Sequence, residues 1–204
     1  MKLANAFKWM NEYRTDQVVV TPAGSGTRAW YEASKDVENT FYLNASMGLV
    51  SMFSAGLAMN APDAHVWGIA GDGGVLMNPG AFVTEAEFLL PNMKHIIIWN
   101  KLFHASGRVR LGNSGEVDFR KVAEGFGVPS ERCFVLSSEE DLESNKHGFS
   151  KEFGYALIVL EIQLDLESGG MGNKPHLDGP ESKYVFGRAR EKALGVKIFD
   201  KQGM

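Results

Sequence analysis

The hydrophobic positions along the chain follow two patterns. Continuous apolar runs rich in β-branched residues are typical of strands that are buried on both faces of a sheet. Segments with apolar residues three or four positions apart predict amphipathic helices. The runs that predict strands are Gln17–Thr21, Thr40–Leu43, His65–Ala70, His95–Trp99, Arg132–Leu136 and Ala156–Ile162. The segments that predict helices are 3–14, Arg28–Lys35, 48–60, Pro79–Leu90, Asp118–Phe126, one starting at Ser138, and Ser182–Leu194 followed by Gly195 as a cap.

Strands and helices alternate throughout, and this order predicts the fold class. We expect an α/β fold, doubly wound, with a mainly parallel sheet and helices on both faces. Residues 1–163 hold all of the predicted strands and form one expected domain. Residues 164–204 begin with a polar stretch rich in Gly and Pro and end with a helix. We expect this part to be a C-terminal arm that packs on the same domain or on a partner subunit.

The segment Asn39–Pro62 carries no charged residue and is long enough to span a bilayer. It contains asparagines, serines and glycines and lacks the Leu/Ile density of a helix that faces lipid. We therefore expect a short strand, a turn and a helix that is buried on all sides. An uncharged helix with small residues in a protein that does not cross a membrane indicates a deep core or a subunit interface.

Composition and charge narrow the function. The 204 residues carry a net charge of −4, with a pI near 5.8, so no domain-wide basic field favours nucleic acid as a partner. A single cysteine, Cys133, excludes a disulfide within the chain and makes the cytoplasm the default compartment. We expect Cys133 to be buried and inert. The start of the chain predicts an amphipathic helix and not a signal peptide.

Candidate chemistry lies where the predicted strands end. Ligands of open parallel sheets bind beyond the carboxyl ends of the strands. Three features fall there: Gly71–Gly74, whose sequence is GDGG, the side chain of Asn100, and the loop Gly24–Thr27. Glycine N–H groups can hold a phosphate, and a carboxylate and an amide oxygen can share Mg²⁺. The sequence therefore predicts a site for a phosphate and a divalent metal.

The spacing of these residues is similar to the motif of thiamine-diphosphate enzymes. Asn100 follows Asp72 by 28 residues and ends the next predicted strand. Met47 precedes Asp72 by 25 residues, as does the bulky residue that bends the cofactor in that family. The resemblance implies thiamine diphosphate and Mg²⁺ as cofactors. The residues it implies as metal ligands are Asp72, Asn100 and, through its carbonyl, Leu102. The remaining residues it implies as cofactor contacts are Ser25, Gly26, Thr27, Ala45, Met47, Gly71, Gly73 and Gly74.

A narrower resemblance is to the pyrophosphate-binding subunits of sulfopyruvate and phosphonopyruvate decarboxylases. Residues 45–82 resemble that group almost throughout, and the likeness extends over roughly 17–190. It implies a two-chain 2-oxoacid decarboxylase, because the chain is too short to hold a pyrimidine-binding domain as well. A separate pyrimidine-binding subunit would supply the catalytic glutamate. The expected assembly is a hetero-oligomer, α2β2 or larger, with the cofactor in the interface.

Two segments depart from the pattern of this group. Trp99-Asn100-Lys101 stands where the group usually has Asn-Asn-Gly. Phe103–Gly107 stands where it has His-Asp-Ser-Val-Gly, so His104 is displaced by one position. His104 is the candidate for handling a proton near the substrate, or is an idle loop residue. Arg108 and Arg110 are candidates for gripping an anionic substrate, or belong to a solvated charged loop.

Alternatives remain open at this point. A carboligase that resembles acyloin or acetolactate synthases would use the same cofactor and join a second carbonyl compound where a decarboxylase adds a proton. A non-catalytic scaffold on the same fold would bind no thiamine diphosphate. A Rossmann-like nucleotide-binding domain fits poorly, because GDGG follows the third strand and not the first. We expect His65 and His95 to be structural, and Glu85 and Glu87 to lie on a helix surface or in an interface.

Overall fold

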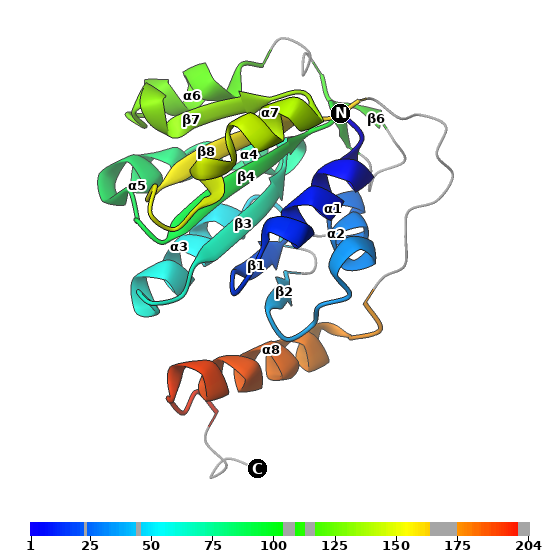
Figure 1. Ribbon diagram of the computed structural model, residues 1–204, viewed down its shortest axis with the longest axis vertical. Coiled ribbons are helices and arrows are strands. Elements are labelled where there is room, and N and C mark those ends of the chain that lie inside the picture. Colours follow the sequence, from blue (N-terminus) through cyan, green and yellow to red (C-terminus); the bar gives the residue numbers. More distant parts are fainter. Residues whose placement is uncertain (23, 44–45, 104–108, 113–116, 164–174, 200–204) are drawn as a thin grey trace.

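Six parallel strands form the central sheet, in the order β2-β1-β3-β4-β8-β7 (Figure 1). The computed structural model describes residues 1–22, 24–43, 46–103, 109–112, 117–163 and 175–199. The strands of the sheet are β1 (Val18–Thr21), β2 (Thr40–Tyr42), β3 (Val66–Gly71), β4 (Met93–Trp99), β7 (Cys133–Leu136) and β8 (Ala156–Glu161). All six were predicted from the apolar runs, with bounds that differ by two residues at most.

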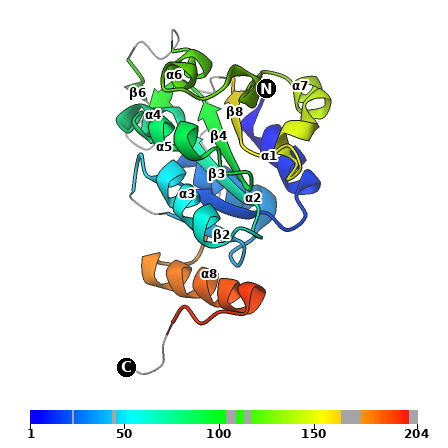
Figure 2. The same cartoon turned by 90° about the vertical axis from the view of Figure 1, so that its left-hand side faces the viewer.

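Helices cover both faces of the sheet, which confirms the doubly wound α/β prediction (Figures 1 and 2). The helices are α1 (Leu3–Tyr13), α2 (Ser25–Ser34), α3 (Val50–Asn60), α4 (Asp72–Met77), α5 (Ala81–Phe88), α6 (Phe119–Gly125), α7 (Glu139–Ser144) and α8 (Gly179–Leu194). The 3-10 turn η3 (Ser130–Arg132) directly precedes β7, and the 3-10 turn η4 (Lys146–Phe149) follows α7. One core cluster includes side chains of α1, α2 and α7, and a second includes those of α3, α4, α5 and α6.

The alternation of side chains along β3 explains why both faces of the sheet are buried. Trp67 and Ile69 belong to the cluster under α1 and α2, whereas Val66 and Ala70 belong to the cluster under α3 and α5. Successive residues of a strand point to opposite faces, so a run that is apolar at every position buries both. At Gly68 a Cβ atom would lie 2.5 Å from Ser54 Oγ, which brings α3 close to the sheet.

The uncharged segment folds as β2, a turn and α3, as its pattern predicts, but α3 is not buried on all sides. Its inward face is formed by Val50, Ser54 and Ala58, whereas Phe53 and Met59 remain 37% and 41% exposed. The prediction of a fully buried helix was wrong, because the sheet covers one face of α3 and leaves Phe53, Gly56 and Met59 exposed on the other. No helix in the described parts of the chain has both the length and the apolar character to cross a membrane.

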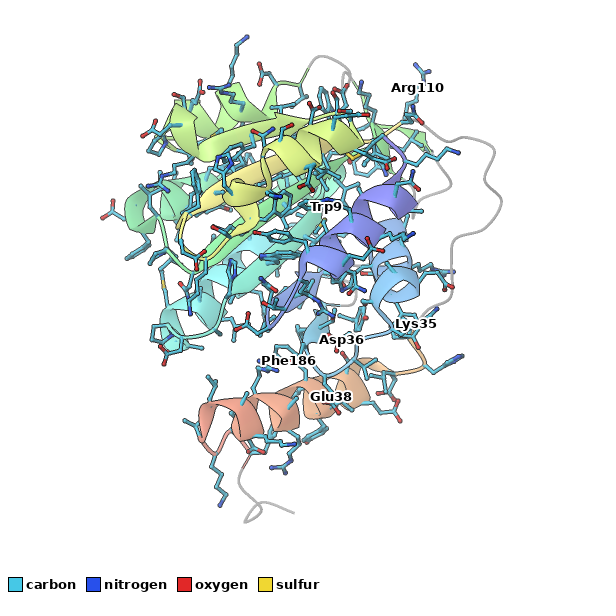
Figure 3. The ribbon with its side chains drawn as sticks, viewed as in Figure 1. Trp9, Lys35, Asp36, Glu38, Arg110 and Phe186 are labelled. Carbon is cyan, nitrogen blue, oxygen red and sulfur yellow. The ribbon has the colours of Figure 1, made fainter. Side chains whose placement is uncertain are left out.

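The C-terminal helix α8 lies along the β2 edge of the sheet (Figures 2 and 3). Phe186 packs against Phe41, with ring centroids 5.2 Å apart, and the Arg190 guanidinium donates to the Asn39 side chain. The helix begins three residues before the predicted start, since Asp178 and Glu181 form a capping box. Gly195 has the left-handed conformation expected of a helix cap, with φ of 65°.

Two short elements were not predicted. After the strand His65–Ala70 no helix was predicted before Pro79, but α4 starts directly at Asp72. The long loop after β4 contains a small antiparallel pair, β5 (Leu102–Phe103) and β6 (Val109–Arg110). Neither α4 nor the β5–β6 pair shows a local hydrophobic periodicity from which it could be predicted.

One lysine lies inside the fold, at the amino-terminal end of the sheet. Lys94 on β4 is fully buried, and its Nζ donates to the Gly154 carbonyl and lies 5.6 Å from the centroid of the Phe153 ring. Burial, together with the nearby Arg132 guanidinium, lowers the pKa of Lys94 to about 7. The folded protein therefore binds fewer protons here than the unfolded chain does between pH 7 and the ordinary lysine pKa.

We expect the free energy of unfolding to rise with pH over this window, because the unfolded state binds more protons there. Lys94→Met removes the titrating group, so the variant should lack roughly 2 kcal/mol of the gain that the wild type shows between pH 7 and 9. Urea unfolding at both pH values measures the difference. The exposed Lys8→Met variant serves as the control. Equal slopes in the wild type and Lys94→Met would contradict a lowered pKa.

Candidate functional site

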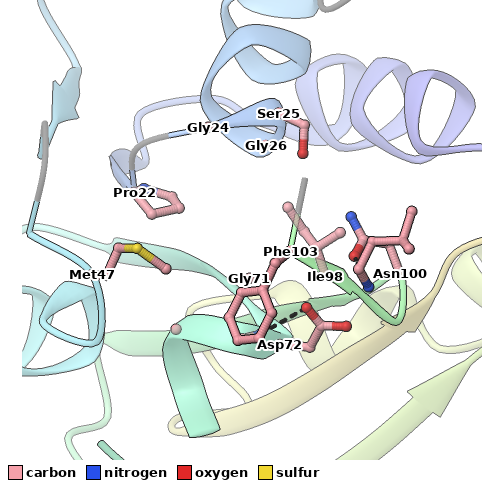
Figure 4. A pocket seen from close by; sticks show the side chains of 13 residues that line it. Pro22, Gly24, Ser25, Gly26, Met47, Gly71, Asp72, Ile98, Asn100 and Phe103 are labelled. Atoms are coloured by element: carbon pink, nitrogen blue, oxygen red, sulfur yellow. Dashed lines mark hydrogen bonds between the residues drawn. The ribbon is translucent and has the colours of Figure 1, made fainter. Parts of the chain in front are cut away.

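The candidate site is a cavity of about 70 Å³ at the carboxyl ends of β1, β3 and β4 (Figure 4). Its walls come from segments that are far apart in the sequence, and they meet because the strands are parallel neighbours. The residues that line it are Pro22, Gly24, Ser25, Gly26, Met47, Gly71, Asp72, Gly73, Gly74, Ile98, Asn100, Leu102 and Phe103. Of the predicted cofactor contacts in the described part of the chain, Thr27 alone is missing from this set.

Asp72 is held in place by backbone donors from two segments. Its Oδ1 accepts from the N–H of Gly73 at 2.7 Å, and its Oδ2 accepts from the N–H of Lys101 at 2.6 Å. The side chain is almost completely buried. Burial raises the pKa of this carboxyl, while the backbone N–H groups of Lys101 and Gly73 oppose the rise. An ionised carboxylate offers about four lone-pair sites, so a cation can be bound in addition to these two hydrogen bonds.

Asn100 and Leu102 complete a set of oxygen donors at the same edge. The Asn100 Oδ1 accepts from the N–H of Leu102 at 3.0 Å, which fixes the amide with its oxygen toward the turn. Both residues line the cavity together with Asp72. A carboxylate, an amide oxygen and a carbonyl are hard ligands of the kind that Mg²⁺ prefers. Across the described residues, no cluster of three or more His, Cys, Asp and Glu side chains could hold a metal.

Lys101 has a left-handed backbone conformation, with φ of 63°. Glycine adopts this conformation without a steric cost, and for lysine it costs about 1 kcal/mol. The conformation directs the Lys101 N–H at Asp72. The side chain lies 3.3 Å from the Glu161 carboxylate and 4.6 Å from the centroid of the Trp99 ring. These contacts offset part of the cost and explain how Trp99-Asn100-Lys101 keeps the geometry of an Asn-Gly turn.

The amino terminus of α2 faces the cavity from the opposite side. Gly24 precedes the helix with φ of 108°, and no side chain caps the first helical N–H groups. Gly24, Ser25 and Gly26 all line the cavity, and a Cβ atom on Gly26 would lie 2.8 Å from the Ile98 side chain. The helix begins three residues earlier than predicted. Uncapped N–H groups at a helix start are suited to binding an anion.

Thr27 is turned away from the cavity. Its hydroxyl lies 2.9 Å from Thr21 Oγ1 and donates to the Pro22 carbonyl, and the residue is 5% exposed. The hydroxyl therefore ties α2 to the end of β1, which leaves Gly24, Ser25 and Gly26 as the residues of this loop that reach the site.

Met47 and Phe103 form much of the apolar wall. Met47 extends from the turn before α3 and is 41% exposed, although it lines the cavity (Figure 4). The Phe103 ring packs on Gly73, where a Cβ atom would lie 2.5 Å from the ring. The Phe103 ring therefore lies close to Asp72, so polar and apolar groups meet at this part of the cavity.

Besides Thr27, four further residues of the sequence hypotheses are not brought into this cavity by the described structure. Ala45, His104 and Arg108 lie outside the described residues, so their roles stay predictions. Arg110 lies on β6, where it is exposed, and it is not among the lining residues (Figure 3).

A buried carboxylate next to the site was missed by the sequence analysis. Glu85 on α5 was expected on a helix surface or in an interface, but its side chain is fully buried. It lies 3.0 Å from Nδ1 of His95 and accepts hydrogen bonds from the hydroxyls of Ser51 and Tyr155. Burial raises the pKa of Glu85, but His95 and the two hydroxyl donors outweigh it, so the net pKa is lowered. The charge pattern of α5 alone gives no sign of this, because the donors come from three other elements.

The Glu85 cluster adjoins the candidate site. His95 and Ser51 line a second cavity of about 20 Å³, which shares Pro22, Gly71 and Gly74 with the first. His95 and its neighbours are structural in the sense that they join α3, α5, β4 and the residue before β8 in the core. His65 is buried beside β3, and burial lowers its pKa to about 4. Cys133 is buried, and burial raises the pKa of its thiol to about 11, as expected of an inert cysteine.

The fold and the site define the class of protein, and comparison with known families agrees. Residues 24–160 match the family described as the C-terminal TPP binding domain of thiamine pyrophosphate enzymes. Since the match covers more than half of the chain, the chain belongs to this family. The matched range contains all of the residues that line the cavity except Pro22.

Individual relatives of the chain belong to a smaller number of enzymes within this family. The chain is 32% identical over 141 residues to the sulfopyruvate decarboxylase subunit beta of Methanocaldococcus jannaschii, covering 69% of each chain. It is 31% identical over 187 residues to the subunit of the same name from Methanococcus maripaludis, covering 91% of this chain and 95% of the relative. A more distant match, 29% identical over 126 residues, is a probable acetolactate synthase large subunit of M. jannaschii, of which 21% is covered.

Removal of the Glu85 carboxylate should destabilise the protein strongly. Glu85→Ala leaves two hydroxyls and an imidazole N–H unpaired in the core, and we expect a loss of about 2–4 kcal/mol in the free energy of unfolding. Urea denaturation measures it. Glu87→Ala on the same helix removes an exposed carboxylate and should change stability by less than about 0.5 kcal/mol. Similar small effects for both variants would contradict the buried cluster.

Proposed function

We propose that the chain is the pyrophosphate-binding subunit of a two-chain 2-oxoacid decarboxylase that depends on thiamine diphosphate and Mg²⁺. The observation that carries the proposal is the joint placement of Asp72, Asn100 and the uncapped start of α2 around one cavity. Oxygen donors for a cation and N–H donors for an anion then face each other across the space that a metal-bound diphosphate would need. The sulfopyruvate decarboxylase relatives support the reaction type.

The residues present fit such a cofactor. Asp72, Asn100 and the Leu102 carbonyl would hold the metal, and Ser25 and Gly26 would donate to the diphosphate through their backbone N–H groups. Gly71 leaves the opposite wall open, because nothing lies within 4 Å of the position that a Cβ atom would take there, so the backbone can approach the phosphates closely at this residue. When bound, thiamine diphosphate supplies a carbon nucleophile and an electron sink for decarboxylation.

Met47 is the candidate for bending the cofactor, and the carbonyl of Ala45 is the candidate acceptor for its exocyclic amine. The position of Met47 on the apolar wall supports this role, because a thioether side chain can pack closely against aromatic rings. His104 remains our candidate for delivering a proton near the substrate, and Arg108 and Arg110 are candidates for contacts with an anionic substrate group.

A second subunit would complete the site. Met47, Leu49 and Phe53 lie at the turn before α3 and in its first half, and all three are more than a third exposed. Apolar side chains gathered beside a candidate site are typical of a surface that a partner covers. The name "subunit beta" of the relatives supports a partner, as does a sulfopyruvate decarboxylase of Methanosarcina acetivorans of which this chain covers 45%. We propose that this partner binds the pyrimidine ring and supplies the catalytic glutamate.

A carboligase is the second candidate function, and the acetolactate synthase match favours it. The two reactions differ in whether a proton or a second carbonyl compound reaches the decarboxylated intermediate. Product analysis with a 2-oxoacid, with and without an added aldehyde, separates them.

The metal ligand gives the most direct test of the cofactor site. Asp72→Asn keeps the size of the side chain but removes its charge, and we expect the Mg²⁺-dependent affinity for thiamine diphosphate to fall by on the order of 100-fold. Calorimetric titration in the presence of Mg²⁺ measures it. The matched variant Asp118→Asn, at the exposed cap of α6, should bind as the wild type does. Wild-type affinity in Asp72→Asn would refute the proposed metal site.

The partner surface can be tested by a charge on the apolar turn. Leu49 is 48% exposed, so Leu49→Asp should leave the fold intact, while association with the second subunit weakens at least about tenfold. Native mass spectrometry of the chain purified with its partner measures the complex. Val196→Asp, at a residue that is 50% exposed after α8, is the control. If the complex with Leu49→Asp were as abundant as with the control, the partner would have to dock elsewhere.

A further inference from the structure

The turn that carries Met47 lies directly against α4. Gly48 has φ of +78°, and a Cβ atom there would lie 3.2 Å from the carbonyl oxygen of Gly74 and 3.2 Å from Cβ of Asn78. The two glycines therefore let the backbone of the turn and the backbone of the helix come into contact. A side chain at Gly48 would be both strained and crowded.

The side chain of Asn78 fastens the turn to the helix. The Nδ2 of Asn78 donates to the carbonyl oxygen of Gly48 at 3.0 Å. Asn78 is also the cap of α4, where its own N–H donates to the Val75 carbonyl. The position of its side chain is thus set by the end of the helix, and the turn follows that position.

The same short helix begins with Asp72. Five residues, 73–77, lie between Asp72, which carries the buried carboxylate at one end of α4, and the cap Asn78 at the other. The carboxylate is fixed by Gly73 and Lys101, and the cap is bonded to Gly48. Met47 is therefore linked to the candidate metal ligand through a helix that is anchored at both ends.

We infer that Asn78 is a positioning residue that holds Met47 in register with the metal and diphosphate site, so that both halves of one cofactor are contacted together. The inference rests on the proposed function and names a residue that touches neither the metal nor the diphosphate. Without the Asn78 amide, the Gly48 carbonyl loses its donor, and the turn is free to move away from α4. The contacts with the thiamine rings then weaken, while those with the diphosphate remain.

Two ligands separate these contacts. Thiamine diphosphate reaches both Met47 and the metal site, whereas inorganic diphosphate reaches the metal site alone. Calorimetric titrations with each ligand, at saturating Mg²⁺, use the full chain together with any subunit that co-purifies with it. The variants are Asn78→Ala and Asn78→Asp, of which the second keeps the shape and removes the donor.

Asn60→Ala is the matched control. Its Nδ2 also donates to a backbone carbonyl, that of Gly56 at 2.8 Å, but at the far end of α3. For both Asn78 variants we expect the affinity for thiamine diphosphate to fall about five- to tenfold, which corresponds to one lost hydrogen bond. The affinity for inorganic diphosphate should stay within about twofold of the wild type, and Asn60→Ala should change neither.

The other outcomes overturn the inference in different ways. If both ligands lose affinity equally, Asn78 supports α4 and the anion site and does not position Met47. If neither loses affinity, the hydrogen bond has no role in binding. If the wild type binds both ligands equally well, the turn contributes nothing to the affinity for thiamine diphosphate. The positioning role of Asn78 is then refuted, while the proposed diphosphate site is still supported. If the wild type binds neither ligand, the proposed function itself fails.

Discussion

The structure depends on the way in which the Asp72 carboxylate joins the ends of two neighbouring strands. One oxygen accepts from the first turn of α4, which follows β3, and the other accepts from the N–H of Lys101, which follows β4. A nearly buried carboxylate needs such donors, since an unpaired one would be very costly in the core. The demand for a donor explains the left-handed Lys101 and the abrupt start of α4, and it sets Asn100 beside Asp72.

Much of the fold could be predicted from the sequence, because strands buried on both faces are apolar at nearly every position. The same pattern placed Asp72 and Asn100 at neighbouring strand ends, where the structure brings them to one cavity. The position of α4 could not be predicted, because six residues that include two glycines carry no periodicity. The burial of Glu85 was also hidden, since its three partners come from distant segments. Ser25 and Thr27 looked equivalent in sequence. In the structure Ser25 lines the cavity, whereas the Thr27 hydroxyl is bonded to the end of β1.

Buried charged groups lie on one side of the cavity, and exposed apolar side chains lie on the other. Behind the cavity, Glu85 binds groups from three other elements and fixes α3 and α5 relative to the sheet. In front of it, Met47 and Leu49 remain exposed on the turn. A buried charged cluster on one side and exposed apolar side chains on the other agree with the proposal that a second chain covers the cofactor. Helix α4 connects these two sides, since it begins at Asp72 and its cap Asn78 donates to the Gly48 carbonyl of the turn.

The most direct test is to locate the metal. Mn²⁺ can replace Mg²⁺ at oxygen sites, and its anomalous scattering marks its position in a crystal of the chain grown with thiamine diphosphate. The account predicts one strong peak within about 2.0–2.3 Å of an Asp72 carboxylate oxygen, the Asn100 amide oxygen and the Leu102 carbonyl, with the diphosphate next to the start of α2. A peak elsewhere, or a bound cofactor whose metal does not touch Asp72, would contradict it.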